Sequence, residues 1–185
     1  EELVQFFGAE RESRWLVKLE EVPAGRAASG EGRLALIRER GVLRVGYARD
    51  RLPFVFRNGN GNLVGFDAEI AHQLARDLGV SLEFVLVETG EYQAPMEDGR
   101  IDLLMSGLTV TPLRATEVRF SEPVMDGTLA FVVRDYERNL FNSRDKVQAL
   151  ERPRIAIMDI PFFIDALRRY LPNAEFKIVE SPRQF

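Results

Sequence analysis

The residue types that suit the binding of a small anion gather between Ser106 and Arg114. Small residues such as Gly107 leave backbone N–H groups accessible, and hydroxyl groups come from Ser106, Thr109 and Thr111. Arg114 adds a planar, permanently charged fork that binds a carboxylate bidentately. This combination predicts a carboxylate site, and the alternative is a threonine-rich turn followed by a surface arginine.

The segments on either side of this stretch support the first interpretation. The apolar run 101–105 predicts a buried strand, so the stretch would follow the carboxyl end of that strand. In a doubly wound sheet, ligands bind at that end. Pro112 is typical of the first turn of a helix, whose positive end would then lie near the anion.

Composition excludes several classes of function. The chain has 185 residues, 45% of them hydrophobic, and a formal net charge of −4, which gives no indication of a nucleic-acid surface. It has no cysteine, which excludes disulfides, thiol nucleophiles and cysteine-ligated metals. No apolar run approaches the length of about 18 residues that a membrane-spanning helix needs.

His72 is the only histidine, so a multi-histidine zinc site is impossible and a Ser-His-Asp triad would have to use it. It lies off the apolar stripe of its predicted helix, and we expect it to face solvent. Asp67 lies in the first turn of that helix, where a carboxylate complements the helix dipole. We expect no catalytic residue, no metal and no cofactor.

The pattern of apolar residues, glycines and prolines predicts three parts. Residues 1–32 form an N-terminal extension with a partial helical stripe and an Ala/Gly/Ser-rich linker, 33–130 a first α/β lobe, and 131–185 a hinge strand with the start of a second lobe. We expect strands at 42–47, 81–87, 101–105, 129–133, 154–158 and 176–179, and helices at 33–40, 70–78, 92–98 and 161–170, with further helices starting near Pro112 and within 140–150. An Asn-Gly turn at 58–62 favours a hairpin.

Seven short stretches share their order and spacing with one known family. They are 41–46 (Gly-Val-Leu-Arg-Val-Gly), Pro53-Phe54, Gly65-Phe66-Asp67, 99–102 (Gly-Arg-Ile-Asp), 106–111 (Ser-Gly-Leu-Thr-Val-Thr), Arg114 and 120–123 (Phe-Ser-Glu-Pro). In this the chain resembles the type 3 extracytoplasmic solute-binding proteins, which include the amino-acid receptors of ABC transporters. The match is strong over 41–133 and weaker over 134–185.

The resemblance implies an α/β, periplasmic-binding-protein-like fold, with a complete first lobe and the beginning of a second one. The two lobes of this family close over the ligand like a clamshell. By resemblance, Arg114 takes the α-carboxylate of the ligand, Thr109 adds its hydroxyl and N–H, and Ser106 and Gly107 lie near the ligand. A hinge crossing would fall near 131–134.

The chain departs from the family pattern at the pocket. Arg51 stands where these receptors usually carry an aromatic residue, so beside Arg114 it would suit a ligand with two anionic groups, and the alternative is that it points to solvent. In the second lobe, the segment 158–162 lacks the usual Gly-Ser/Thr pair. Asp159 there would either meet a ligand amine or cap the helix that begins at Pro161.

Three functions fit these observations. The first is an extracytoplasmic domain that captures an amino acid or dicarboxylate for transport or sensing, with a membrane transporter or receptor subunit as partner. The second is an accessory domain of a larger membrane protein. The non-Met start agrees with a processed or excised piece and leaves room for a membrane tether, and unpaired strand edges in the incomplete lobe favour dimerisation. The third is an enzyme, which the resemblance implies because relatives of this family include a periplasmic dehydratase; Glu88, Glu91 and Asp159 are candidates by position alone.

Overall fold

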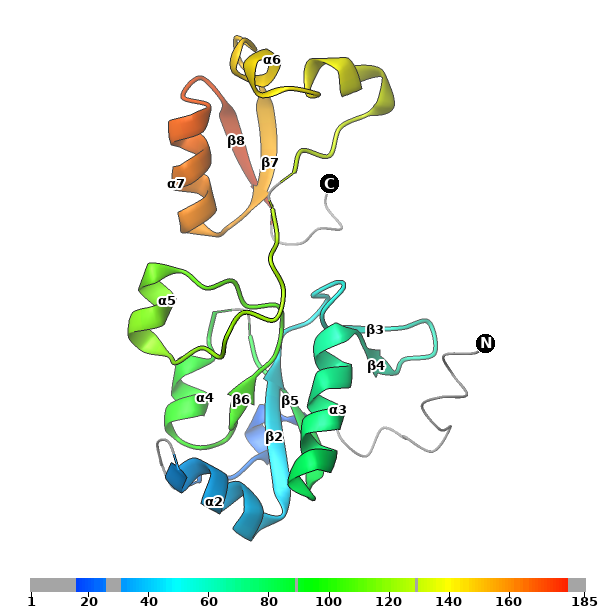
Figure 1. Cartoon of the computed structure of the whole chain (residues 1–185), viewed down its shortest axis with the longest axis vertical. Helices are drawn as coiled ribbons and strands as arrows, with labels where there is room; N and C mark the ends of the chain where they lie inside the picture. The colour runs from blue at the N-terminus through cyan, green and yellow to red at the C-terminus, as the bar shows by residue number, and fades with distance from the viewer. Residues whose placement is uncertain (1–15, 26–30, 89, 129, 180–185) are drawn as a thin grey trace. The chain divides into compact units, whose positions relative to one another are not determined.

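A computed structural model describes residues 16–25, 31–88, 90–128 and 130–179. The chain forms two units, one up to Val118 and one from Arg119 onward, which are described separately here (Figure 1). The expected helical stripe of the extension includes Phe6, Phe7 and Trp15, which lie outside the described residues. The predicted boundaries at 32 and 130 stay predictions.

Four parallel strands form the sheet of the first unit. They are β1 (Leu16–Lys18), β2 (Val42–Tyr47), β5 (Ser81–Leu86) and β6 (Leu103–Leu104), in the order β1-β5-β2-β6. The sheet confirms the predicted α/β class and the strands expected at 42–47 and 81–87. The prediction for 16–18 was wrong, because these residues pair with β5 as an edge strand instead of forming a helix. Of the strand expected at 101–105, only Leu103–Leu104 forms a strand, β6.

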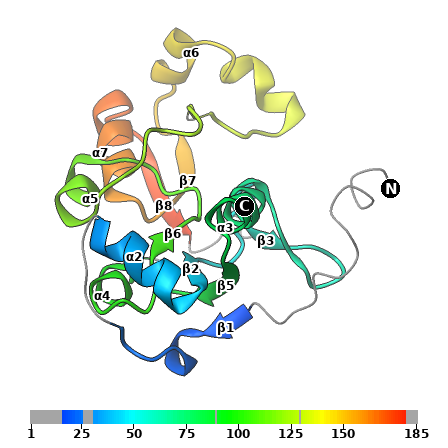
Figure 2. The same ribbon diagram turned by 60° about the horizontal axis from the view of Figure 1, so that its bottom comes forward.

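The apolar side chains of this sheet alternate between two faces, as the period of a strand requires. One face carries Leu43, Val45 and Phe84 and packs against small residues of α3 (Phe66–Leu78). The other face carries Val85 and packs against Val22, Ile101 and the short helix α4 (Gln93–Glu97). Figure 2, which looks nearly along the strands, shows α3 and α4 on opposite sides of the sheet. The sheet is therefore buried on both faces, which is typical of parallel sheets.

Glycines end two of these helices where the sequence predicts it. α2 (Glu31–Arg40) stops at Gly41 and α3 stops at Gly79, with φ of 70° and 69°. A left-handed C′ residue of this kind lets the last N–H groups bond back to the helix carbonyls. The strands β3 (Phe56–Arg57) and β4 (Leu63–Val64) confirm the hairpin expected around 58–62. None of the helices in the described ranges is long and apolar enough to span a lipid bilayer.

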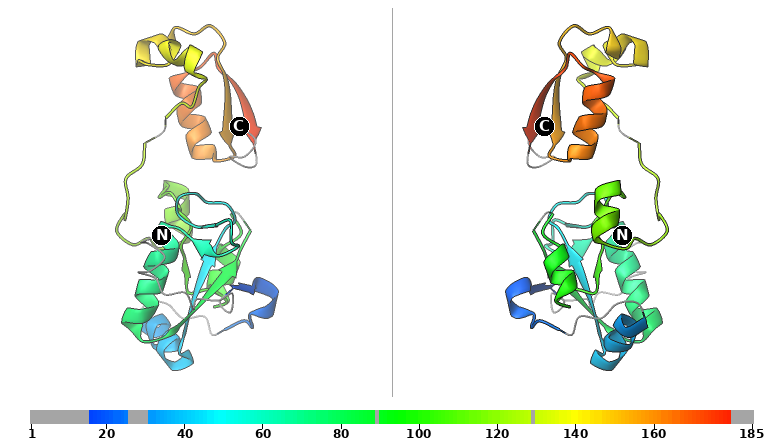
Figure 3. Two further views of the ribbon diagram at one scale, coloured as in Figure 1. Left: turned by 90° about the vertical axis from the view of Figure 1, so that its right-hand side faces the viewer. Right: turned by 90° about the vertical axis from the view of Figure 1, so that its left-hand side faces the viewer.

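The second unit is a small βαβ unit with a helical lead-in. It contains a 3-10 helix, η2 (Asp135–Leu140), then α6 (Arg144–Gln148), β7 (Arg154–Met158), α7 (Pro161–Tyr170) and β8 (Glu175–Val179). The strands β7 and β8 pair in parallel, and α7 lies beside them (Figure 3). These elements confirm the predicted order of strand, helix and strand.

The strand predicted at 129–133 is absent from the part that the structure describes. Leu129 lies outside that part, and residues 130–133 form no ladder with another strand. Val132 is 98% exposed. A short apolar run becomes a strand only when a neighbouring edge supplies the hydrogen bonds, and the described residues offer none to this segment.

Candidate functional site

The candidate site lies on the turn that follows β6, at the carboxyl ends of the parallel strands. Met105 N–H donates to Gly46 O at 3.0 Å, and Ala48 N–H donates to Ser106 Oγ at 3.1 Å. Ser106 is only 4% exposed. Its hydroxyl therefore joins the end of β6 to the end of β2, so the predicted contact residue is part of the support of the turn.

Gly107 connects this turn to α3. Its φ is 58°, and its N–H donates to Asp67 Oδ2 at 2.6 Å. A Cβ atom at this position would lie 2.2 Å from the ring of Phe54, closer than any real contact. Only glycine fits here, and its N–H serves Asp67 rather than pointing to open space.

Asp67 is the residue whose role the sequence analysis missed. The helix-dipole explanation accounts for the place of Asp67 at the start of α3. However, the residue is 6% exposed, and its carboxylate holds the turn through Gly107. Burial raises the pKa of Asp67, and the Gly107 N–H opposes part of that rise. The Gly65-Phe66-Asp67 motif is the signal that could have indicated this role.

The loop 51–55 packs against the start of the same helix. Phe66 N–H donates to Pro53 O at 3.1 Å, and Asp67 N–H donates to Phe54 O at 2.9 Å. Gly65 has φ of 127°, and a Cβ atom there would lie 2.4 Å from Phe54 O. These close contacts place Phe54 against Gly107 and bring Arg51, at the other end of the loop, toward the turn.

Arg114 belongs to the short helix α5 (Pro112–Glu117), and Pro112 occupies its first turn as the sequence predicts. Thr111 caps this helix, since its Oγ1 accepts a hydrogen bond from Arg114 N–H at 3.3 Å. The Arg114 Nη1 group donates to Thr109 O at 3.0 Å. Arg114 is half-buried and the side chain of Thr109 is exposed, so both can meet a ligand.

Arg51 does not point away into solvent. It is half-buried, and its Nε donates to Ser106 O at 3.4 Å, a long hydrogen bond that places it on the same turn. Burial, and secondarily the positive charge of Arg114, lower the pKa of Arg51. The structure therefore brings Arg51, Ser106, Gly107, Thr109 and Arg114 together at one turn.

Asp159 lies in the second unit, between β7 and α7, and is exposed. It does not cap α7, because Ile160 occupies the cap position and the helix start has no side-chain cap. The capping prediction was wrong for this reason, and contact with a ligand amine stays a prediction. His72 also differs from expectation: it is half-buried, with its ring edge-on to Phe84 at 5.6 Å.

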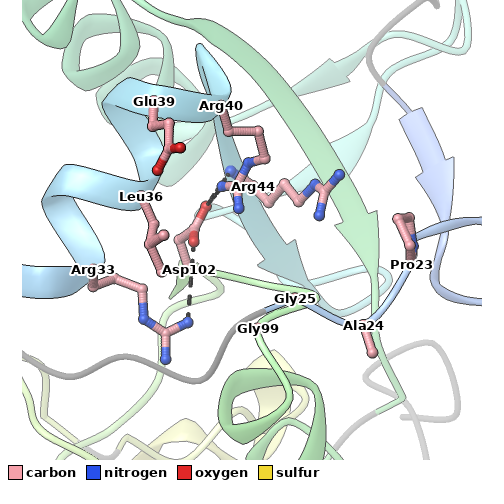
Figure 4. Close-up of a pocket in the computed structure, with 10 residues that line it drawn as sticks. All are labelled: Pro23, Ala24, Gly25, Arg33, Leu36, Glu39, Arg40, Arg44, Gly99 and Asp102. Carbon is pink, nitrogen blue, oxygen red and sulfur yellow. Dashed lines mark hydrogen bonds and ion pairs between the residues drawn. The ribbon is translucent and has the colours of Figure 1, made fainter.

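A cavity of about 420 Å³ lies at the opposite, amino end of the strands. It is lined by three arginines, Arg33, Arg40 and Arg44, around the buried carboxylate of Asp102 (Figure 4). Arg40 forms an ion pair with Asp102, which also accepts Arg44 N–H at 2.9 Å. These groups join α2 to β2 and to the turn before β6, so we assign them to the stability of the fold.

The candidate acid–base residues Glu88 and Glu91 are exposed. Within the described ranges, no group of three His or acidic side chains is arranged to hold a metal ion. What the turn offers is two guanidinium groups and an exposed hydroxyl, a donor set that suits carboxylates.

Comparison with known proteins gives a consistent result. The family model of bacterial extracellular solute-binding proteins, family 3, matches residues 43–169. The L-cystine-binding protein TcyJ of Escherichia coli K12 is 31% identical over 121 residues, 65% of this chain and 46% of that protein. The cyclohexadienyl dehydratase of Pseudomonas aeruginosa is 37% identical over 95 residues, 51% of this chain and 35% of that protein. The chain therefore spans less than half the length of both relatives.

A solved structure extends the likeness beyond sequence. The ancestral amino acid-binding protein AncCDT-1, a precursor of cyclohexadienyl dehydratase, superposes with a TM-score of 0.73 at 32% identity. The match covers 82% of this chain and 66% of that one. It confirms the predicted periplasmic-binding-protein-like architecture.

Proposed function

The chain belongs to the bacterial extracellular solute-binding proteins of family 3, and from this membership we propose that its first unit binds the carboxylate of an amino acid. The observation that carries the proposal is the half-buried Arg114 on the turn after β6. Its remaining guanidinium N–H groups can bind both oxygens of a carboxylate. The exposed hydroxyl of Thr109 adds a further donor.

Ser106 and Gly107 take a supporting part in this proposal. The Oγ of Ser106 accepts Ala48 N–H and the N–H of Gly107 serves Asp67. These two residues hold the turn in the conformation that presents Thr109 and Arg114. The relatives that bind cystine and other amino acids support an amino-acid ligand.

We place this binding role outside the cytoplasmic membrane, where the domain passes its ligand to a transporter or receptor subunit. Such a role needs no chemistry, and we propose that the domain is not an enzyme. Catalysis is the competing hypothesis, because one of the relatives is a dehydratase. General acid–base catalysis needs a carboxylate that is positioned against the substrate, and the candidates Glu88 and Glu91 are exposed.

The test is a thermal-shift screen of the natural amino acids and small dicarboxylates, with the Arg114→Ala variant beside the parent. A ligand at 100 times its Kd adds about 2.7 kcal/mol of stability. We expect the parent to shift with at least one compound, and the variant to lose about 2–5 kcal/mol of binding energy because the carboxylate is left unpaired. A folded parent that shifts with no compound would contradict the proposal and favour an accessory domain.

A further inference from the structure

Two arginines from distant parts of the chain are anchored on one turn. Arg51 Nε donates to Ser106 O, and Arg114 Nη1 donates to Thr109 O. Each side chain uses one of its five N–H donors in these bonds. The turn thus fixes two guanidinium groups and leaves the forked ends of both with donors to spare.

Neither Arg51 nor Arg114 forms an ion pair with a carboxylate of the described ranges. Ion pairs elsewhere in the unit join Arg33 and Arg40 to Asp102, Arg44 to Glu83 and Arg100 to Asp98. Asp67 lies near the turn, but its hydrogen bond goes to Gly107 N–H. Two guanidinium groups therefore lie at one turn without an ion-pair partner in the described part of the chain.

The pKa of Arg51 reflects its position beside Arg114. Its pKa is lowered first by desolvation and then by repulsion from Arg114. A bound anion beside Arg51 would remove part of both costs, because an opposite charge favours the charged form. One carboxylate is satisfied by one bidentate fork, so a ligand with a single carboxylate leaves the second arginine unbalanced.

We propose that Arg51 is a specificity-determining residue that binds a second anionic group of the ligand, so that the site takes molecules with two carboxylates. This inference rests on the proposed function, in which Arg114 binds the first carboxylate. The ligand class is then an acidic amino acid or a simple dicarboxylate. Both kinds of ligand carry two carboxylates, and the experiment below distinguishes one kind from the other.

The experiment is calorimetric titration of the whole 185-residue chain with matched ligand pairs. L-glutamate is compared with L-glutamine, L-aspartate with L-asparagine, and succinate is added as a dicarboxylate without an amine. We expect the acidic member of at least one pair, or succinate, to bind about tenfold or more tightly than the amides, whose side chains carry no charge. Tighter binding of the acidic amino acid identifies it as the ligand, and tighter binding of succinate identifies a simple dicarboxylate.

The variant Arg51→Gln is expected to abolish this preference, because it weakens binding of the acidic ligand about 10- to 100-fold more than binding of the matching amide. Arg49→Gln is the matched control, since it removes the same charge from an exposed position of the same loop. It should keep the preference. A parent that binds the amides as well as the acids, or an Arg51→Gln variant with an unchanged ratio, would overturn the inference.

The Arg114→Ala variant distinguishes failure of the proposed carboxylate site from failure of the second subsite at Arg51. If this variant loses all ligands while Arg51→Gln leaves the ratio unchanged, the carboxylate site stands and the second subsite is wrong. If the folded parent binds none of the ligands and no other amino acid, the proposed function fails and the inference fails with it.

Discussion

At Gly107 the backbone passes so close to the Phe54 ring that a side chain has no room. We expect Gly107→Ala to destabilise the first unit by about 2–4 kcal/mol, because overpacking and a left-handed backbone at a non-glycine residue both cost energy. The free energy of unfolding in urea measures this. The same variant should lose ligand binding, since the turn that carries Arg114 must shift.

Variants at two other glycines distinguish the cost of the contact with Phe54 from the cost of the left-handed backbone. Gly41 also has a positive φ, but a Cβ atom there meets nothing within 4 Å, so Gly41→Ala reports backbone strain alone. Gly59 has neither constraint, and Gly59→Ala should be nearly neutral. If Gly107→Ala costs no more than Gly41→Ala, then the contact with Phe54 is not what requires glycine here.

A second prediction for a single residue concerns how Asp67 makes stability depend on pH. Its pKa is raised in the folded protein, so the folded state holds this proton more strongly than the unfolded state does. Stability from this group is therefore largest at low pH, and it falls as pH rises from the ordinary aspartate pKa through the raised one. Asp67→Asn removes that dependence and keeps an oxygen for Gly107 N–H.

The measurement is the unfolding free energy of parent and Asp67→Asn at several pH values between 4 and 7. Other titrating groups cancel in the difference between the two proteins. We expect the parent to lose stability relative to the variant as pH rises. A difference that grows in favour of the parent would show that the Gly107 hydrogen bond outweighs burial at Asp67.

At the scale of elements, the sequence predicted those whose signals are local. α3 has its apolar stripe, and Gly41 and Gly79 stand at helix ends where their φ values require glycine. The predicted first-turn proline of α5 is also confirmed. Each of these signals acts within one or two helical turns. The local sequence is therefore enough to predict the element, without knowledge of its tertiary contacts.

The elements predicted wrongly depend on partners elsewhere in the chain. β1 is a strand because the edge of β5 accepts it, and residues 130–133 are not a strand because no described edge does. Short apolar runs such as these are compatible with both outcomes. Sequence periodicity thus describes which face is apolar, and long-range pairing decides whether a strand forms.

The same distinction applies to the site. Spacing and residue type pointed to the turn from Ser106 to Arg114. They did not reveal that Gly107 N–H and Ser106 Oγ have intramolecular partners, because Asp67 and Ala48 lie far away in the sequence. They also left the direction of Arg51 open, which the contact with Ser106 O decides.

For the whole molecule, the two units differ in how much core they contain. The first unit buries both faces of a parallel sheet. The second depends on two paired strands, with a core cluster of Val147, Ile155 and Leu171, and leaves Phe162 and Ile178 each 46% exposed. A two-stranded sheet with little core is marginally stable, so the units should differ in stability.

We therefore expect amide hydrogens in 154–179 to exchange faster than those of β2 and β5, as local opening does in regions with few buried contacts. Val147→Ala should lower the stability of the second unit by about 1–3 kcal/mol and speed exchange there alone. Hydrogen exchange followed by mass spectrometry resolves both regions in one experiment. Equal protection in the two regions, or faster exchange in β2 and β5 caused by Val147→Ala, would mean that the units unfold together. Ligand binding to the first unit would then stabilise the whole chain rather than the turn and its sheet.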